Sequence, residues 1–235
     1  MAEERVLYEG KAKITYATDN PNVVRLYYKD SATAFDGKKK GTIKGKGSFN
    51  SAITEVFFKL LENAGVATHY IDRPSDREMR VKMLRMIPLE VVVRNVTAGS
   101  LAKRMGIPEG TALSSTILEY YYKDDSLGDP LLCESHIHAL EICSKDNLAK
   151  IGRMALKVNE VLTPFLAQRD IKLIDFKLEF GFDSEGEILL GDEISPDSCR
   201  FWDAKTNEKM DKDRFRRDLG QVEEFYAELH RRITS

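Results

Sequence analysis

The chain has 235 residues, of which 42% are hydrophobic, so it is long enough to bury the core of one large domain or of two small lobes. Its 36 Lys and Arg side chains are offset by 38 Asp and Glu, and a net charge of −2 argues against a general nucleic-acid coat protein. Three cysteines without a CxxC pair, and no apolar leader after Met1, favour a cytoplasmic protein. No apolar run is long enough to span a bilayer.

The first third of the chain predicts short strands followed by one helix. Runs rich in Val, Ile, Thr, Leu and Tyr are separated by turn residues, and they cover Arg5–Glu9, Ala12–Thr18 and Val23–Lys29. A polar, glycine-rich loop is expected from Asp36 to Gly47. Apolar residues at helical spacing then predict a helix over Ser51–Asn63.

The rest of the chain mixes strands and helices. Strands are expected over Met79–Met86 and Leu89–Val96, with a break at Ile87-Pro88 because proline removes a backbone donor. The other expected elements are a helix at Ala98–Met105, a strand at Ile117–Lys123, a helix at Asn147–Leu166, strands at Lys172–Phe182 and Glu187–Leu190, and helices at Lys212–Arg217 and Gln221–Ile233. This order predicts an α+β fold rather than a doubly wound sheet, and no GxGxxG follows a strand.

The most informative segment is the strand Ile174–Phe180. It alternates strictly, so Asp175, Lys177 and Glu179 share one face. If the turn that follows centres between residues 184 and 185, Glu179 opposes Leu190 and lies diagonally from Asp192, about 7–8 Å away at the backbone. Two such carboxylates can share one Mg²⁺. The alternative is a solvated sheet face with internal ion pairs.

Three further segments each fit an anion site and also an ordinary structural role. Gly10–Lys13 allows a close backbone approach to a triphosphate with two lysines to neutralise it, or is a simple hairpin turn. Lys38–Lys46 holds five lysines in nine positions and is an anion-binding loop or a solvated charge run. Arg94–Ser100 suits a phosphate at a helix start, or is a capped helix.

Several motifs in the same order as in one known family give a resemblance over essentially the whole chain. They are Tyr8–Lys13, Ile87–Asn95, Ala98–Leu101, Asp175–Gly181, Gly191–Asp197 and Met210–Arg216. Together they resemble the phosphoribosylaminoimidazole-succinocarboxamide synthases, also called SAICAR synthetases, in their bacterial single-function form.

The resemblance implies a two-lobed α+β fold with ATP in the cleft. Residues 1–86 would form an N-terminal antiparallel sheet lobe like that of protein kinases, and residues 87–235 a larger mixed α+β lobe that holds the ribonucleotide and the metal. Family membership also implies an ATP- and Mg²⁺-dependent amide ligase of purine synthesis and a cytoplasmic homodimer. That enzyme would join L-aspartate to carboxyaminoimidazole ribonucleotide through an acyl phosphate, giving SAICAR, ADP and phosphate.

The resemblance also carries roles onto individual residues. The nucleotide would contact Gly10, Lys11, Ala12, Lys13, Lys82 and Met86, and the ribonucleotide Arg94, Ser100, Asp197 and Arg200. Mg²⁺ would be held by Glu179 and Asp192. Asp175, Lys177 and Asp36 would line the reacting end, with Asp175 as the hypothetical proton acceptor of the amine.

Two other functions remain open from the sequence. A small-molecule phosphotransferase would need a similar ATP site, although the HRD and DFG motifs of protein kinases are absent. An RNA-binding module could use Lys38–Lys46, but no aromatic residues are interleaved there for base stacking, and the acidic segment 175–197 would have no role. We therefore expect small-molecule substrates and neither a nucleic-acid nor a membrane partner.

Overall fold

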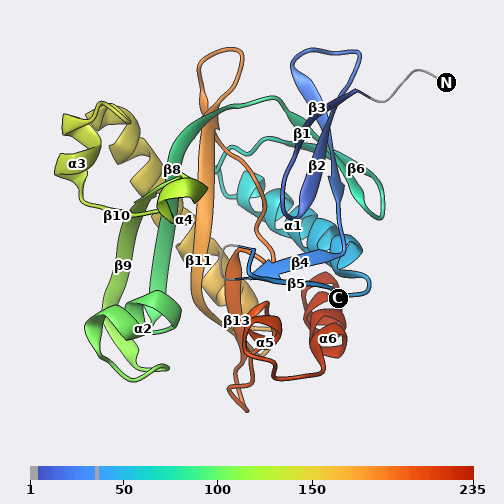
Figure 1. Ribbon diagram of the computed structural model, residues 1–235, viewed down its shortest axis with the longest axis vertical. Helices are drawn as coiled ribbons and strands as arrows, with labels where there is room; N and C mark the ends of the chain where they lie inside the picture. The colour runs from blue at the N-terminus through green and yellow to red at the C-terminus, as the bar shows by residue number, and fades with distance from the viewer. Residues whose placement is uncertain (1–4, 35–36) are drawn as a thin grey trace.

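Turn residues divide the start of the chain into short antiparallel strands. The computed structural model describes residues 5–34 and 37–235, and its first sheet has the order β1-β2-β3-β7-β6 (Figure 1). Its strands are β1 (Val6–Glu9), β2 (Lys13–Ala17), β3 (Val23–Tyr28), β6 (Tyr70–Ser75) and β7 (Glu78–Lys82). The three strands predicted before residue 30 are confirmed, and β3 turns Val24, Leu26 and Tyr28 into the core.

A small hairpin and a long helix follow, where a loop was predicted. The hairpin pairs β4 (Ser31–Ala34) with β5 (Lys39–Thr42), and α1 spans Lys46–Asn63. The helix begins early because the Asp30 carboxylate accepts hydrogen bonds from the backbone N–H groups of Gly45 and Gly47, at 3.3 and 2.9 Å. The prediction of a loop over 36–47 is therefore wrong for β5 and for the first turn of α1. Asp36 lies outside the described residues.

The second sheet is also antiparallel and contains the longest strands. Its order is β10-β9-β8-β11-β12, and β13 pairs with the other half of the β11 edge. Its strands are β8 (Arg85–Val96), β9 (Ala112–Tyr122), β10 (Leu131–Leu132), β11 (Ile171–Phe182), β12 (Ile188–Leu190) and β13 (Cys199–Asp203). The α+β class with antiparallel sheets is thereby confirmed.

Proline 88 does not interrupt its strand. β8 runs through it, and the break predicted at Ile87-Pro88 is wrong. The pairing with β11 is irregular at this point, because Glu179 pairs with Glu90 whereas Gly181 pairs with Met86. Such a bulge tolerates a residue that cannot donate a ladder hydrogen bond.

The register of the β11–β12 hairpin differs from the prediction by one residue. Phe180, not Glu179, faces Leu190, and Phe182 faces Ile188. The connection is longer than assumed because the Asp183 side chain accepts hydrogen bonds from the backbone N–H groups of Glu185 and Glu187, at 3.0 and 2.9 Å. Asp192 lies beyond β12, where its backbone is in the left-handed region with φ 56°.

Helices cover the second sheet and close the chain. They are α2 (Gly99–Met105), the 3₁₀ turn η1 (Asp125–Leu127), α3 (Glu134–Ala139), α4 (Lys145–Ala167), α5 (Asp213–Arg216) and α6 (Val222–Thr234). One continuous core joins Phe57 of α1, Leu162 of α4 and Phe201 of β13, each fully buried. Among the described residues, no helix is long and apolar enough to cross a membrane.

Candidate active site

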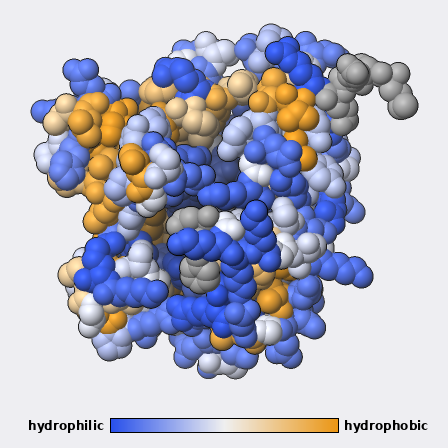
Figure 2. Space-filling view, viewed as in Figure 1, coloured by the Kyte–Doolittle hydropathy of each residue, from blue (hydrophilic) through white to orange (hydrophobic). Residues whose placement is uncertain are grey.

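Two adjoining cavities open on one face of the molecule, where Figure 2 shows a hollow lined by hydrophilic side chains. The larger, of about 580 Å³, lies between the Gly10–Lys13 turn and the end of β11. The smaller, of about 380 Å³, lies over the middle of β8 and β11. Both are lined by Glu90, Asp129, Lys177, Asp197 and Ser198, so molecules bound in the two cavities would meet at this shared wall.

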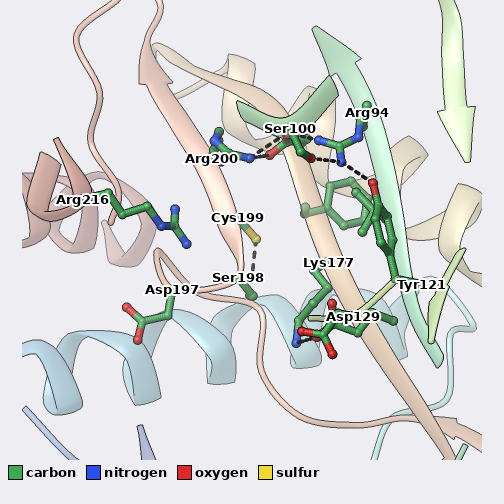
Figure 3. A pocket seen from close by; sticks show the side chains of 14 residues that line it. Arg94, Ser100, Tyr121, Asp129, Lys177, Asp197, Ser198, Cys199, Arg200 and Arg216 are labelled. Carbon is green, nitrogen blue, oxygen red and sulfur yellow. Dashed lines mark hydrogen bonds and ion pairs between the residues drawn. The ribbon is translucent and has the colours of Figure 1, made fainter. Parts of the chain in front are cut away.

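Two arginines from neighbouring strands hold one carboxylate in the smaller cavity (Figure 3). Arg94 of β8 donates to Asp175 at 2.9 Å, and Arg200 of β13 donates to both oxygens of Asp175 at 3.0 Å. Antiparallel pairing sets this up, because Asp175 on β11 lies opposite both arginines. Gly99 has φ +52° and packs against Arg200, whose Nη2 lies 2.4 Å from the position of an added Cβ.

Further polar contacts fix both guanidinium groups. Arg94 also donates to Ser100 and Tyr121, each at 3.1 Å. Arg200 donates to Asp213 at 2.8 Å. Burial raises the pKa of Asp213, but Arg200 and its neighbours outweigh this effect and bring that pKa to about 2. Two oriented guanidinium groups beside a serine hydroxyl suit a phosphate.

Lys177 joins the two cavities. Its ammonium lies 2.8 Å from Glu90 and 2.5 Å from Glu179, and Lys123 reaches Glu179 from β9's end. Burial lowers the pKa of Lys177, but the carboxylates of Glu179, Asp192 and Glu90 raise it well above its usual value. Lys177 therefore stays a cation at the shared wall and is suited to neutralising charge there.

The carboxylates at the end of β11 and after β12 surround a cationic centre. Lys13 lies 2.5 Å from Asp192 and 2.9 Å from Glu193. Burial raises the pKa of Asp192, but Lys13, Lys177 and Lys123 together hold it well below its usual range. No group of three or more His, Cys, Asp or Glu in the described part of the chain is arranged to hold a metal alone.

Glu179 and Asp192 fit a hard cation that takes its remaining ligands elsewhere. Both line the larger cavity, offer carboxylate oxygens and are neutralised by lysine ammonium groups in this structure. Mg²⁺ is commonly held by one or two carboxylates and completed by water and phosphate oxygens. The donor set is therefore of the kind that Mg²⁺ uses.

The rest of the larger cavity is lined by both lysines and apolar side chains. Lys11, Lys13 and Lys82 line it together with the apolar side chains of Val24, Leu26, Val81, Leu84 and Met86. At its mouth Lys11 forms an ion pair with Asp125 of η1 at 2.8 Å. A lining that combines apolar side chains with lysines suits a purine and its phosphates.

The structure brings the predicted site residues together. Lining the larger cavity are Gly10, Lys11, Ala12, Lys13, Lys82, Met86, Glu179 and Asp192. Around the smaller one lie Arg94, Ser100, Asp175 and Arg200, while Lys177 and Asp197 line both. Asp36 is outside the described residues, and the role of each residue stays a prediction.

Sequence reasoning missed three lysines in or beside these cavities. Lys46 is buried and lies 2.8 Å from Asp197, although the sequence put it in a solvated loop or an anion-binding loop. Lys123 and Lys212 line the larger cavity. Lys212 belongs to the segment Met210–Arg216 that resembles the family, and this position could have indicated a site residue. Lys123 follows the tyrosine-rich strand, and that position gives no such indication.

The antiparallel α+β fold and two adjoining cavities with a shared, charged wall are typical of an enzyme that binds two substrates side by side. The family model for SAICAR synthetase matches residues 6–233. The phosphoribosylaminoimidazole-succinocarboxamide synthase of Brevibacillus brevis is 56% identical over 233 residues, covering 99% of this chain and 98% of that protein.

Solved structures agree with this match. The enzyme of the same name from Ehrlichia chaffeensis superposes with a TM-score of 0.96 at 44% identity over 98% of both chains. A SAICAR synthetase in complex with ADP gives a TM-score of 0.93 at 52% identity over 97% of both chains. The chain belongs to the SAICAR synthetase family and is an ATP-dependent ligase of purine synthesis.

Proposed function

We propose that this chain joins L-aspartate to carboxyaminoimidazole ribonucleotide and converts ATP to ADP and phosphate. The observation that carries this proposal is the wall shared by the two cavities, with the cation of Lys177 at its centre. A ligase needs its nucleotide and its acceptor to meet, and these cavities share a wall of charged side chains that includes Lys177. We take residues 1–86 and 87–235 as the two lobes, the first resembling the N-lobe of protein kinases.

ATP occupies the larger cavity in this proposal. The purine lies against the apolar side chains near Met86, and the triphosphate lies under Gly10–Lys13 with Lys82 nearby. The cavity's size and its combination of apolar side chains with lysines support a nucleotide here. A relative that is 52% identical has been solved with ADP, which supports a nucleotide in this chain as well.

The ribonucleotide occupies the smaller cavity. Its phosphate binds Arg94, Arg200 and Ser100, and its ribose lies near Asp197. Asp175 holds both guanidinium groups, so we assign it a role in orienting them. Both carboxylate oxygens of Asp175 already accept hydrogen bonds from arginine side chains. The contacts of Asp175 therefore give no support to the hypothesis that it accepts the proton of the amine.

Glu179 and Asp192 would hold Mg²⁺, which supplies neutralising charge to the phosphates of the nucleotide when bound. Two lysines of the chain supply further positive charge. Lys13 neutralises phosphate oxygens, and Lys177 stabilises the negative charge that develops where the two substrates meet. Because both substrates are held at the shared wall, they react as neighbours in one complex and do not have to meet by diffusion.

The reaction follows the usual logic of amide formation from a carboxylate. A carboxylate oxygen of the ribonucleotide attacks the γ-phosphorus, the bond to the β-phosphate oxygen breaks, and ADP leaves. The amine of aspartate then attacks the acyl carbon, phosphate leaves with the bonding electrons, and the amine gives up a proton. Activation is needed because oxide is a far worse leaving group than phosphate.

The test is ADP release by purified protein with ATP, Mg²⁺, aspartate and carboxyaminoimidazole ribonucleotide, each omitted in turn. We expect release to need all four components and the product mass to equal that of the joined succinocarboxamide. ADP release without aspartate would instead identify a phosphotransferase.

We further propose that the protein is cytoplasmic and forms a homodimer. Size-exclusion chromatography with light scattering measures the oligomeric state.

A further inference from the structure

Two cations one helical turn apart face the place where the cavities join. Lys212 lines the larger cavity and Arg216 lines the smaller. The backbone N–H of Arg216 donates to the carbonyl of Lys212 at 2.9 Å, so their side chains leave the same side of α5. Figure 3 shows the Arg216 side chain reaching from α5 into the cavity near Asp197.

Lys212 lies farther from the nearest carboxylate oxygen than Lys46 does. Its ammonium lies 3.4 Å from Asp197 Oδ2, whereas that of Lys46 lies 2.8 Å from the same oxygen. The other oxygen of Asp197 accepts a hydrogen bond from Tyr226 at 3.0 Å. The Lys212 side chain is 12% exposed, so water neutralises little of its charge. Burial, together with the charges of Lys46 and Arg216, lowers the pKa of Lys212 despite the attraction of Asp197.

Arg216 adds a second positive charge to this corner. One of its Nη atoms donates to Asp213 at 2.6 Å, and Asp213 is already bound by Arg200. The Arg216 side chain remains 29% exposed toward the cavity. Lys212 and Arg216 therefore place two cations at this corner, and the nearest carboxylate lies 3.4 Å from the Lys212 ammonium, so the pair is suited to binding an added anion.

We propose that Lys212 and Arg216 form a binding subsite for a carboxylate of the amino-acid substrate, a role that rests on the proposed ligase function. The phosphates already have other partners in that function, at Gly10–Lys13 and at the Arg94–Arg200 pair. A carboxylate held at the junction leaves the amine of the same molecule directed at the shared wall. The subsite thus aligns the nucleophile with the activated acyl group.

The decisive experiment compares steady-state constants of the Lys212→Met enzyme with those of the wild type. Loss of one charged contact should raise KM for aspartate about 10- to 100-fold. We expect kcat and the KM values for ATP and the ribonucleotide to stay within about threefold of wild type. Lys212→Arg, which keeps the charge, should restore most of the aspartate affinity. Lys205→Met, on an exposed lysine remote from both cavities, is the matched control.

The outcomes separate this subsite from other roles. A rise in KM for ATP or for the ribonucleotide alone would identify a phosphate contact and overturn the proposal. A fall in kcat with unchanged KM for aspartate would make Lys212 part of the chemical step and would also overturn it. Loss of the aspartate requirement in the wild type would instead overturn the ligase function itself. Circular dichroism melting of each variant separates these effects from misfolding.

The pH dependence gives an independent readout. The groups around the Lys212 ammonium are Asp197, Lys46, Arg216 and Glu193, with Tyr226 bound behind Asp197. A bound carboxylate stabilises the protonated lysine, so KM for aspartate should rise with pH as free Lys212 loses its proton. Lys212→Arg should flatten this rise, because a guanidinium stays charged. A profile that is identical in both enzymes contradicts the subsite.

Discussion

Replacing Gly99 by alanine should displace Arg200 from the ribonucleotide cavity. A Cβ at this position would lie 2.4 Å from Nη2 and 2.8 Å from Cζ of Arg200. The planar guanidinium cannot yield at one nitrogen alone, so its two 3.0 Å contacts with Asp175 must lengthen. Charged hydrogen bonds contribute about 1.5–3 kcal/mol, so a loss of about 2–3 kcal/mol should raise KM for the ribonucleotide roughly 30- to 150-fold.

The assay is ADP release with the ribonucleotide varied at saturating ATP, Mg²⁺ and aspartate. Gly106→Ala is a matched control at the other end of α2, because Gly106 has φ +63° and nothing lies within 4 Å of its added Cβ. It should lose about 1 kcal/mol of stability from the backbone conformation and keep the wild-type KM. A Gly99→Ala enzyme with wild-type KM and normal stability would refute this account of Arg200.

Three other perturbations test the site and its electrostatics. Asp175→Asn should lower turnover, because it weakens the hydrogen bonds that orient Arg94 and Arg200. ATP affinity should stay unchanged, because Asp175 does not line the larger cavity, and isothermal titration with ATP measures this affinity. Burial and the neighbouring Asp213 raise the pKa of Asp211 to about 7, so the folded protein keeps a proton that the unfolded chain loses near pH 4. Stability should therefore fall as pH rises from about 4 to about 7, and Asp211→Asn should lack this slope in urea unfolding. Chelation of Mg²⁺ should abolish ADP release, and Glu179→Gln should raise the Mg²⁺ concentration needed for half-maximal rate by about tenfold or more; an unchanged requirement would remove Glu179 from the metal site.

Local patterns predicted most strands and long helices. β1, β2 and β3 follow from short β-branched runs between turn residues, and α4 begins at Lys145 because Ser144 caps it by accepting from Asn147 N–H. The start of α1 could not be predicted in this way. Its cap is the side chain of Asp30, which lies 16 residues before Lys46 in the sequence and belongs to a preceding strand connection.

Pairing between strands was harder to predict than the strands themselves. The β11–β12 connection is one residue longer than predicted, which shifts the pairing by one residue, and only the fold reveals that Asp183 organises this turn. The same limit explains why Lys46 was missed at the site. Its partner Asp197 is 151 residues away, and no spacing in the sequence reports such a contact.

β11 also gives the site a fixed spacer. Asp175 and Glu179 stand four residues apart on one extended strand, a separation of about 13 Å along its axis. That length depends on covalent geometry and on pairing with β8, and not on how the sheet of residues 6–82 sits over the larger cavity. The distance between the arginine pair around Asp175 and the carboxylate of Glu179 is therefore set within one strand and does not depend on the first sheet.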